Sequence, residues 1–262
     1  MAYTQVNVPF EGLRSPIGID VDTERSTYVT TQGTHSVIKL TLDETQTTLP
    51  FTGLRMPHGV KVDAAGNVFV VDHGNNRVVK LGTDGVQVTL PFEGLSFPNG
   101  VDVDAAGNVY VTAGNGINDH VLMMDLDEQV TELPFTGLAE PFGIVVDHLG
   151  SITITNKRDE LTGVRRLDAQ RKQTVLPFSR LGAPTGVDVD TAGNTYVTNF
   201  GADSFTPNIA MLDLAGVTTR VPFGQLSILR PVGIAIDHLD NITVLDWIGP
   251  VERLEKADSR DN

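Results

Sequence analysis

The chain of 262 residues contains no cysteine, which excludes disulfides, thiolate metal ligands and cysteine nucleophiles. Its apolar runs are short and interrupted by Asp, Gly or Thr, so we expect no membrane-spanning segment and no insertion into a membrane. Lys and Arg number only 19 against 33 Asp and Glu, a formal net charge of −14. Because contacts to phosphates need clustered cations and no basic run is present, no nucleic-acid partner is expected.

The N-terminal stretch MAYTQVNVPFEG lacks both the charged and the apolar region of a secretory signal. This absence favours a cytoplasmic protein, with a secreted mature form as the alternative. The chain is long enough for one large domain or two small ones.

What the chain does have is repetition. A Pro-Phe motif, as in LPFTGLRMPHGVKVD from Leu49, recurs at intervals of 41 to 45 residues. The six copies place its proline at Pro9, Pro50, Pro91, Pro134, Pro177 and Pro222. Since repeats of this length stack on one another to bury a common core, we expect a single domain spanning residues 1–262.

Each repeat has the pattern of four short strands. In the second copy these are Gly59–Asp63, Val68–Val71, Arg77–Leu81 and Val86–Leu90, rich in Val and separated by Gly- and Asn-containing turns. Four strands in a unit of this size are typical of a propeller blade. The sequence therefore predicts an all-β, six-bladed β-propeller of four-stranded blades.

The two ends of the chain are expected to close the ring. The last copy supplies only three strands, Gly233–Asp237, Ile242–Leu245 and Val251–Leu254, whereas Thr4–Val8 at the N-terminus belongs to no copy. We predict that this N-terminal strand completes the last blade, because pairing the two ends removes two exposed sheet edges.

The repeated motif P-x-G-[VI]-x-[VI]-D-x-x-G-N-x-[YF]-V resembles NHL repeats, and the resemblance covers nearly the whole chain. The stretches LPFTGL, GNVYVT and NNRVVKL are most similar to the sensor propeller of a bacterial transmembrane Ser/Thr kinase. A more distant similarity is to streptogramin B lyase and peptidylglycine amidating lyase. The first resemblance implies a module that binds a ligand or a protein, and the second implies a propeller enzyme.

Function is expected where the six copies differ. The residues before the repeat glycine are Ile17, His58, Asn99, Phe142, Thr185 and Val232, and further variable positions follow the second strand at Gln32, Asp72, His73, Asn156, Lys157, Asn199, Phe200 and Trp247. Apolar walls with a few polar groups are typical of small-molecule sites. We predict one asymmetric pocket for a small molecule or peptide on the top face, which carries the loops before the first strands.

Within this pocket, His58 is the predicted general base or metal ligand, since imidazole titrates near neutrality and the lyases imply a histidine before the glycine. His73 and Asp72 are expected to assist it, and Lys157 to hold a carboxylate or a developing oxyanion. The remaining variable residues are expected to contact substrate, with the aromatic ones stacking on it. Each has a structural alternative: an exposed loop for His58, an ordinary repeat residue for Asp72, surface charge for Lys157 and core packing for the aromatics.

The first strands carry a further pattern. Asp20, Asp102 and Asp188 occupy the middle position of G-[VI]-x-[VI]-D in alternate blades. If they face the axis, their mutual repulsion favours a hard cation such as Ca²⁺ or Mg²⁺. The alternatives are that Lys61 neutralises part of this charge, or that the aspartates bond neighbouring blades across a water-filled channel.

No motif for an organic cofactor or a phosphate-cradling loop is present. A lyase, isomerase or cyclase reaction with acid–base chemistry is therefore the expected activity, and a non-catalytic module that binds a ligand or protein is the alternative. The loops Gly114–His120 and Phe200–Asn208 are candidate lids.

Overall fold

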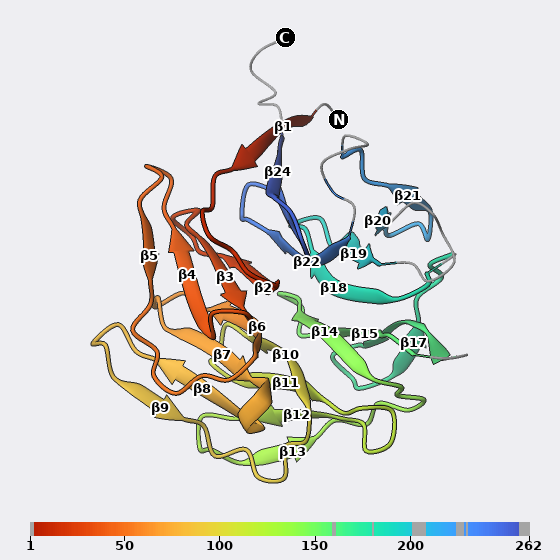
Figure 1. Ribbon diagram of the computed structural model, residues 1–262. Helices are drawn as coiled ribbons and strands as arrows, with labels where there is room; N and C mark the ends of the chain where they lie inside the picture. Colours follow the sequence, from red (N-terminus) through yellow and green to blue (C-terminus); the bar gives the residue numbers. More distant parts are fainter. Residues whose placement is uncertain are drawn as a thin grey trace.

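The computed structural model describes residues 3–158, 161–179, 181–200, 208–223, 228 and 230–256. Its strands form six four-stranded antiparallel sheets arranged around a central axis (Figure 1). The predicted six-bladed β-propeller is therefore confirmed. Within the described residues, no helix has the length and hydrophobicity needed to cross a bilayer.

Every blade has an inner, a second, a third and an outer strand. The inner strands are β2 (Pro16–Val21), β6 (Pro57–Val62), β10 (Pro98–Val103), β14 (Pro141–Val146), β18 (Pro184–Val189) and β22 (Pro231–Ile236). The second strands are β3 (Thr27–Thr31), β7 (Val68–Asp72), β11 (Val109–Ala113), β15 (Ile152–Asn156), β19 (Thr195–Asn199) and β23 (Ile242–Asp246). The third strands are β4 (Ser36–Leu40), β8 (Arg77–Leu81), β12 (His120–Met124), β16 (Gly163–Leu167), β20 (Asn208–Leu212) and β24 (Val251–Lys256). The outer strands are β5 (Gln46–Thr48), β9 (Gln87–Thr89), β13 (Val130–Glu132), β17 (Gln173–Val175), β21 (Thr218–Arg220) and, for the last blade, β1 (Tyr3–Val8).

The N-terminal strand closes the ring as predicted. β1 pairs antiparallel with β24 over its full length, from Tyr3 opposite Lys256 to Val8 opposite Val251, and so completes the sheet of the last blade (Figure 1). Gln5 adds a side-chain bond to Glu252 across the same pair (3.2 Å). Both ends of the chain are thereby held in one sheet.

The core lies between neighbouring blades. Phe92 of a Pro-Phe pair is buried against Phe69 and Val71 of the second blade and Val101 and Val111 of the third. Phe135 and Phe223 take the same place further around the ring. Burying one such ring contributes roughly 1.5–3 kcal/mol, so the repeated Pro-Phe motif holds blade against blade.

The aspartates that follow the inner strands make turns rather than binding sites. The carboxylate of Asp63 accepts the backbone N–H groups of Ala65 (3.0 Å) and Asn67 (2.8 Å) and the side-chain amide of Asn67 (2.7 Å). The same turn-closing bonds occur at Asp22, Asp104, Asp147, Asp190 and Asp237. Short Asp side chains suit such turns because they replace missing backbone acceptors.

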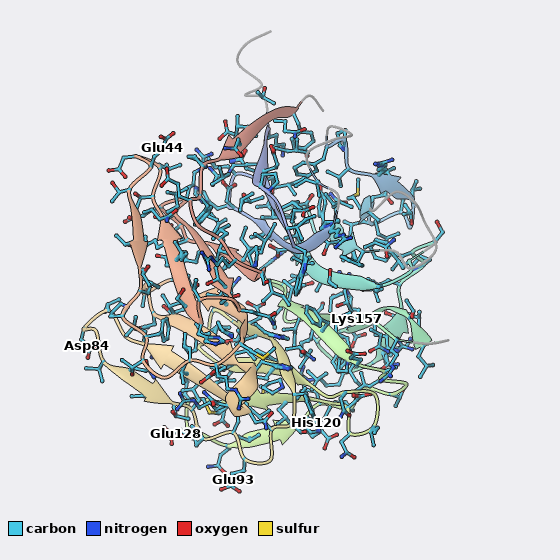
Figure 2. All side chains as sticks on the ribbon, viewed as in Figure 1. Glu44, Asp84, Glu93, His120, Glu128 and Lys157 are labelled. Atoms are coloured by element: carbon cyan, nitrogen blue, oxygen red, sulfur yellow. The ribbon has the colours of Figure 1, made fainter. Side chains whose placement is uncertain are left out.

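These turns also explain where the negative charge lies. The hairpins between third and fourth strands use aspartates in the same way, at Asp43, Asp84, Asp125, Asp168 and Asp213. Both sets lie on the bottom face, opposite the loops before the inner strands. Figure 2 shows Glu44, Asp84 and Glu128 at the outer rim and Lys157 nearer the centre. Much of the acidity thus comes from turn formation and is kept away from the top face.

Candidate functional site

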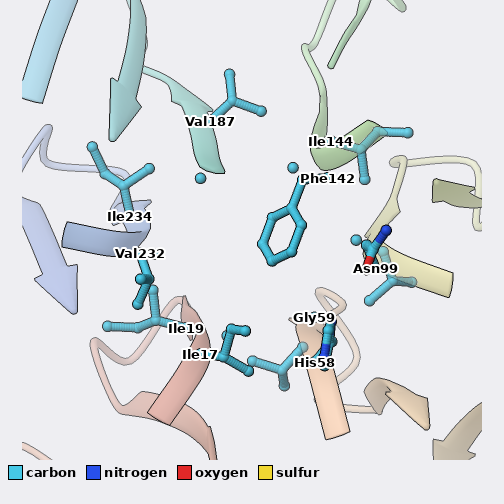
Figure 3. A pocket seen from close by; sticks show the side chains of 17 residues that line it. Ile17, Ile19, His58, Gly59, Asn99, Phe142, Ile144, Val187, Val232 and Ile234 are labelled. Carbon is cyan, nitrogen blue, oxygen red and sulfur yellow. The ribbon is translucent and has the colours of Figure 1, made fainter. Parts of the chain in front are cut away.

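A cavity of about 80 Å³ opens on the axis of the ring and is here called the upper cavity. Of the variable residues that precede the repeat glycines, those lining it are Ile17, His58, Asn99, Phe142 and Val232 (Figure 3). The sixth such residue, Thr185, is buried, and its hydroxyl shares a hydrogen bond with the hydroxyl of Thr198 (2.9 Å). The structure thus brings together five of the six positions at which the repeats differ before glycine.

A bulge in each inner strand turns these side chains to the axis. In β6 the register passes from Pro57 opposite Asp72 directly to Val60 opposite Val70, which leaves His58 and Gly59 outside the regular ladder. Bulges re-aim side chains in this way and are common beside functional sites. The glycines are required because blades approach closely: a Cβ on Gly100 would collide with the carbonyl oxygen of Phe142.

His58 and His73 form a parallel stack. Their ring centroids are 3.8 Å apart and their planes differ by 5°. His73 begins the 3₁₀ turn η1 (His73–Asn75) after β7, and its Nδ1 lies 2.8 Å from the carbonyl oxygen of Pro98. Because a carbonyl oxygen only accepts, Nδ1 of His73 carries a proton in this contact, and in the neutral ring the lone pair is then on Nε2.

The second imidazole holds an unpaired nitrogen. His58 is 7% exposed, and within the described residues its Nδ1 has no hydrogen-bond partner. Burial lowers the pKa of His58 to about 3, with the charges of His73 and Lys157 acting in the same direction and a side-chain hydrogen bond with Asn99 opposing them. The amide nitrogen of Asn99 donates to the carbonyl of Pro141 (3.0 Å), so its oxygen remains to accept from Nε2 of His58. His58 is therefore neutral at pH 7, with Nδ1 as a bare acceptor.

Phe142 and Lys157 lie above the histidine pair. Figure 3 shows the Phe142 ring projecting into the middle of the axial opening. Its centroid is 5.9 Å from that of His58, and the Nζ of Lys157 lies 4.7 Å from the same Phe142 centroid. This cation–π contact contributes roughly 0.5–2 kcal/mol. No carboxylate of the described residues lies within ion-pair distance of Lys157.

Asp72 faces away from both histidines. It lies opposite Pro57 at the end of the β6–β7 ladder and is fully buried. Its carboxylate accepts the backbone N–H of Arg55 (2.6 Å) and the guanidinium Nε of Arg77 (2.7 Å). Asp72 thus anchors the loop before β6, as expected of an ordinary repeat residue, and these bonds involve neither His58 nor His73.

The equivalent residues of later blades also bond the loop before their inner strand. Asn156 donates to the carbonyl of Gly137 (2.7 Å), and Asn199 accepts from the backbone N–H of Gly182 (2.8 Å). Both side chains are fully buried in these contacts. This position therefore serves the loops of the top face and lies outside the lining of the upper cavity.

The remaining predicted contacts lie beside the upper cavity rather than in its wall. Phe200 and Trp247 pack half-buried on the apolar cluster that contains Val232. Gln32 is half-buried, and its backbone N–H bonds the carbonyl of Ser15 (3.1 Å). Of the two candidate lids, the loop 114–120 bonds the next blade through Asp119 and Glu140 (3.1 Å), and the second, residues 200–208, falls mostly outside the described residues.

Six aliphatic side chains, one from each inner strand, surround the axis below the upper cavity. This aliphatic ring consists of Ile19, Val60, Val101, Ile144, Val187 and Ile234, all buried. The same side chains border a second cavity of about 50 Å³, here called the lower cavity, which also contains Asp20, Lys61, Asp102 and Asp188. The aspartates predicted as a cation site are thus separated from His58 by the aliphatic ring.

The aspartates of the lower cavity bond neighbouring blades. Each carboxylate accepts a backbone N–H of the next inner strand: Asp20 from Val62 (2.7 Å), Asp102 from Val146 (2.6 Å) and Asp188 from Ile236 (2.7 Å). Lys61 lies between two of them, with its Nζ 3.2 Å from Asp102 and 3.5 Å from Asp20. Although burial opposes its charge, these two carboxylates raise the pKa of Lys61.

This arrangement does not fit a divalent cation. Lys61 already supplies positive charge, and burial raises the pKa of Asp188 to about 7 and also raises that of Asp20, with Lys61 opposing both shifts. Within the described part of the chain, no three His, Asp or Glu side chains are placed to hold a metal ion. The stacked histidines are unsuitable as a pair of ligands too, because their in-plane lone pairs cannot converge on one ion. The geometry favours Lys61 and the blade-to-blade bonds over the expected Ca²⁺ or Mg²⁺ site.

Four threonines that support the upper cavity were not anticipated. Thr112 accepts the N–H of Gly100 (2.8 Å) and donates to the carbonyl of Phe142 in the next blade (2.7 Å). Thr30 makes the same pair of bonds with Gly18 and the carbonyl of His58. Thr155 repeats the arrangement, and Thr198 accepts from the glycine of its own blade. In the sequence, four copies have threonine at this position of the second strand. The other two copies have Val71 and Leu245 there.

Comparison with known proteins supports the fold. The model of the NHL repeat family matches residues 54–81, and no curated protein matches the chain. The structure is similar to a streptogramin B lyase, with 12% sequence identity, a TM-score of 0.71 and 97% of each chain covered. It is also similar to a gluconolactonase from Xanthomonas campestris, with 15% identity, a TM-score of 0.78, and 97% of this chain and 89% of the other covered.

A complex between two proteins also occurs among the similar structures. A nidogen–laminin complex contains a chain with 22% identity and a TM-score of 0.73, covering 85% of this chain and 84% of that one. At such identities the similarity establishes a shared propeller fold and leaves the function to be argued from the site.

Proposed function

We propose that this propeller binds a small molecule at the upper cavity, on its top face. The observation that carries the proposal is the bare Nδ1 of His58, which is buried without a hydrogen-bond partner among the described residues. Leaving such a nitrogen unpaired costs about 1–3 kcal/mol of folding free energy. A ligand that donates a hydrogen bond recovers this cost, and that recovery supports binding at this site.

The charges of the top face support the same proposal. The exposed or half-exposed cations on its loops include Arg14, Arg55, Lys157, Arg158 and Arg230, whereas the turn aspartates lie on the bottom face. Of these cations, Lys157 lies 4.7 Å from the centre of the Phe142 ring at the upper cavity, where its charge favours an anionic ligand. Because the upper cavity holds only about 80 Å³, part of a larger ligand lies above it, between the loops.

The test is a ligand-observed NMR screen of a fragment library against the wild-type protein and the H58F variant. Phenylalanine keeps a planar ring beside His73 but removes both ring nitrogens. We expect a group of fragments that bind the wild type and lose most of their affinity for H58F. A library in which no fragment distinguishes the two proteins contradicts the proposal.

A second candidate is acid–base catalysis of the lyase, isomerase or cyclase type, and it is favoured by His73. Its Nδ1 is held by the carbonyl of Pro98, which directs the lone pair of Nε2 outward, and Lys157 supplies a cation near the same cavity. An oriented base beside a cation suits proton abstraction with stabilisation of a developing oxyanion. His58, whose pKa is lowered to about 3, serves better as a hydrogen-bond acceptor than as the base.

Catalysis is tested with any fragment or compound that binds. Wild type and H73Q are incubated with each binder, and the products are followed by mass spectrometry and by exchange of carbon-bound hydrogen with deuterated solvent. Turnover or exchange that disappears in H73Q supports the enzyme. Binding without either, in the wild type, leaves the chain a binding module.

A further inference from the structure

Phe142 occupies the space that a ligand needs to reach His58. Its ring projects into the middle of the axial opening (Figure 3), and its centroid lies 5.9 Å from that of the His58 ring. Nδ1 of His58 has almost no surface open to solvent in this arrangement. A donor that approaches along the axis meets the Phe142 ring before it reaches His58 (Figure 3).

The ring also shows what the space accepts. It is a planar apolar group with an imidazole on one side and a cation 4.7 Å from its centre. When the Phe142 side chain rotates out, the volume it leaves suits another planar apolar group of the same size. Phe142 is half-buried and lies in the bulge of β14 rather than in a regular ladder, so rotation breaks no strand pairing.

The contact between Lys157 and Phe142 explains how a ligand can displace the Phe142 ring. Within the described residues its ammonium group contacts the face of Phe142 and no carboxylate. A charge-assisted hydrogen bond to an anion is stronger than a cation–π contact at a half-exposed position. An anionic ligand therefore draws Lys157 away from Phe142 and removes the contact that holds the ring in the opening.

Resting on the proposed function, we propose that the ligand is a small carboxylate with a planar apolar body and a hydrogen-bond donor, and that it binds by displacing Phe142. The carboxylate pairs with Lys157, the planar body takes the place of the Phe142 ring, and the donor group pairs with Nδ1 of His58. Asn99 keeps that nitrogen unprotonated by accepting from the opposite side of the imidazole.

Three matched probes separate these parts. Mandelate carries a carboxylate, a phenyl ring and a hydroxyl; phenylacetate lacks the hydroxyl; mandelamide lacks the charge. Dissociation constants are measured by NMR titration of the histidine ring nitrogens. Phenylacetate cannot donate to Nδ1 of His58, and mandelamide cannot form an ion pair with Lys157. Mandelate should therefore bind about tenfold more tightly than either analogue. Equal affinity for the three probes, or no binding of mandelate at tens of millimolar, overturns the inference.

Variants then test each residue. K157Q should weaken mandelate about tenfold and leave mandelamide unchanged, whereas K172Q, which removes the same charge from the bottom turn of the same blade, should change neither. F142A, and the more conservative F142L, should bind mandelate more tightly than wild type, because the ring no longer has to be displaced. Weaker binding to both Phe142 variants contradicts displacement.

The two proposals fail in different ways. If neutral fragments perturb His58 but carboxylates do not, the ligand class is wrong and binding at the upper cavity stands. If no fragment of any charge perturbs His58, both proposals fall.

Discussion

Each of the two cavities on the axis is lined by equivalent residues from successive blades. The polar groups of the two cavities differ in whether they have hydrogen-bond or ion-pair partners. In the lower cavity each aspartate accepts a backbone N–H of the next blade, and Lys61 pairs with Asp20 and Asp102. In the upper cavity the Nδ1 of His58 has no partner and Lys157 no carboxylate, among the residues the structure describes. The aliphatic ring borders both cavities and lies between the two sets along the inner strands.

Buried polar groups without a partner are uncommon in folded proteins, and perturbed titratable groups cluster at functional sites. The difference between the two cavities therefore supports the proposal that the upper cavity is functional, whereas the lower cavity belongs to the scaffold of the ring. The comparison predicts large effects on stability from changes in the lower cavity and effects on binding from changes in the upper one.

The largest loss of stability is expected from K61M. Removing the cation leaves Asp20 and Asp102 as neighbouring carboxylates in a confined space, and breaking a buried ion pair in this way costs about 3 kcal/mol or more. The free energy of unfolding is measured by urea titration at pH 7.5. A loss below about 0.5 kcal/mol would place Lys61 among ordinary surface charges and remove the contrast between the cavities.

The next largest effect is expected from T112V. Thr112 joins Gly100 of its own blade to Phe142 of the next, and valine leaves this buried N–H and carbonyl unpaired. The expected loss is about 2 kcal/mol in the free energy of unfolding. The reverse change, V71T, is the matched control, because it introduces the hydroxyl in a blade that lacks it and should not destabilise. If both variants unfold like the wild type, the threonines do not brace the upper cavity.

A smaller effect, on pH dependence, is expected from Asp188. Burial raises the pKa of Asp188 in the folded state to about 7, above the value of 3.8 expected in the unfolded chain. The folded state then binds more protons between these values, so this carboxyl makes stability fall as pH rises from about 4 to 7, and the loss stays constant at higher pH. The difference in unfolding free energy between wild type and D188N, measured by urea titration across this range, should show that decline. A flat difference contradicts it.

His58 should produce a slope of stability against pH with the opposite sign. Its pKa is lowered from 6.5 in the unfolded chain to about 3 in the fold, so the unfolded state binds more protons between these values. Its contribution to stability is therefore complete above pH 6.5 and is lost as pH falls toward 3. The difference between wild type and H58Q is the measurement, and a slope of the same sign as that of D188N is the contrary result.

The fold was predictable because it is repeated six times. The Pro-Phe spacing, the four strands per unit and the surplus Thr4–Val8 strand led to six blades closed by β1, as observed. Each copy supports the same assignment, so an irregular strand in one blade does not change the conclusion. Turn formation by Asp63 and its equivalents followed from short-range chemistry and was also predictable.

The site was predictable only in part. Residues before the repeat glycines vary, and five of them meet at the upper cavity; those ending the second strand vary too, yet Asp72 and Asn156 bond the loops. Which variable position faces the axis depends on the bulge in the inner strand, and no single residue signals it. The separation of Asp20 from His58 likewise depends on the aliphatic ring, whose Val and Ile side chains read as ordinary core.

The most direct test of the functional upper cavity is the ring ¹⁵N spectrum of His58, recorded across neutral pH with and without a bound small molecule such as mandelate. Without ligand, we expect a neutral imidazole that is protonated at Nε2 and bare at Nδ1. When a ligand donates to Nδ1, we expect a marked change in the ¹⁵N chemical shift of that nitrogen alone. A His58 ring that titrates near pH 6.5 as in water, or a bound ligand that leaves its Nδ1 unchanged, would contradict the account.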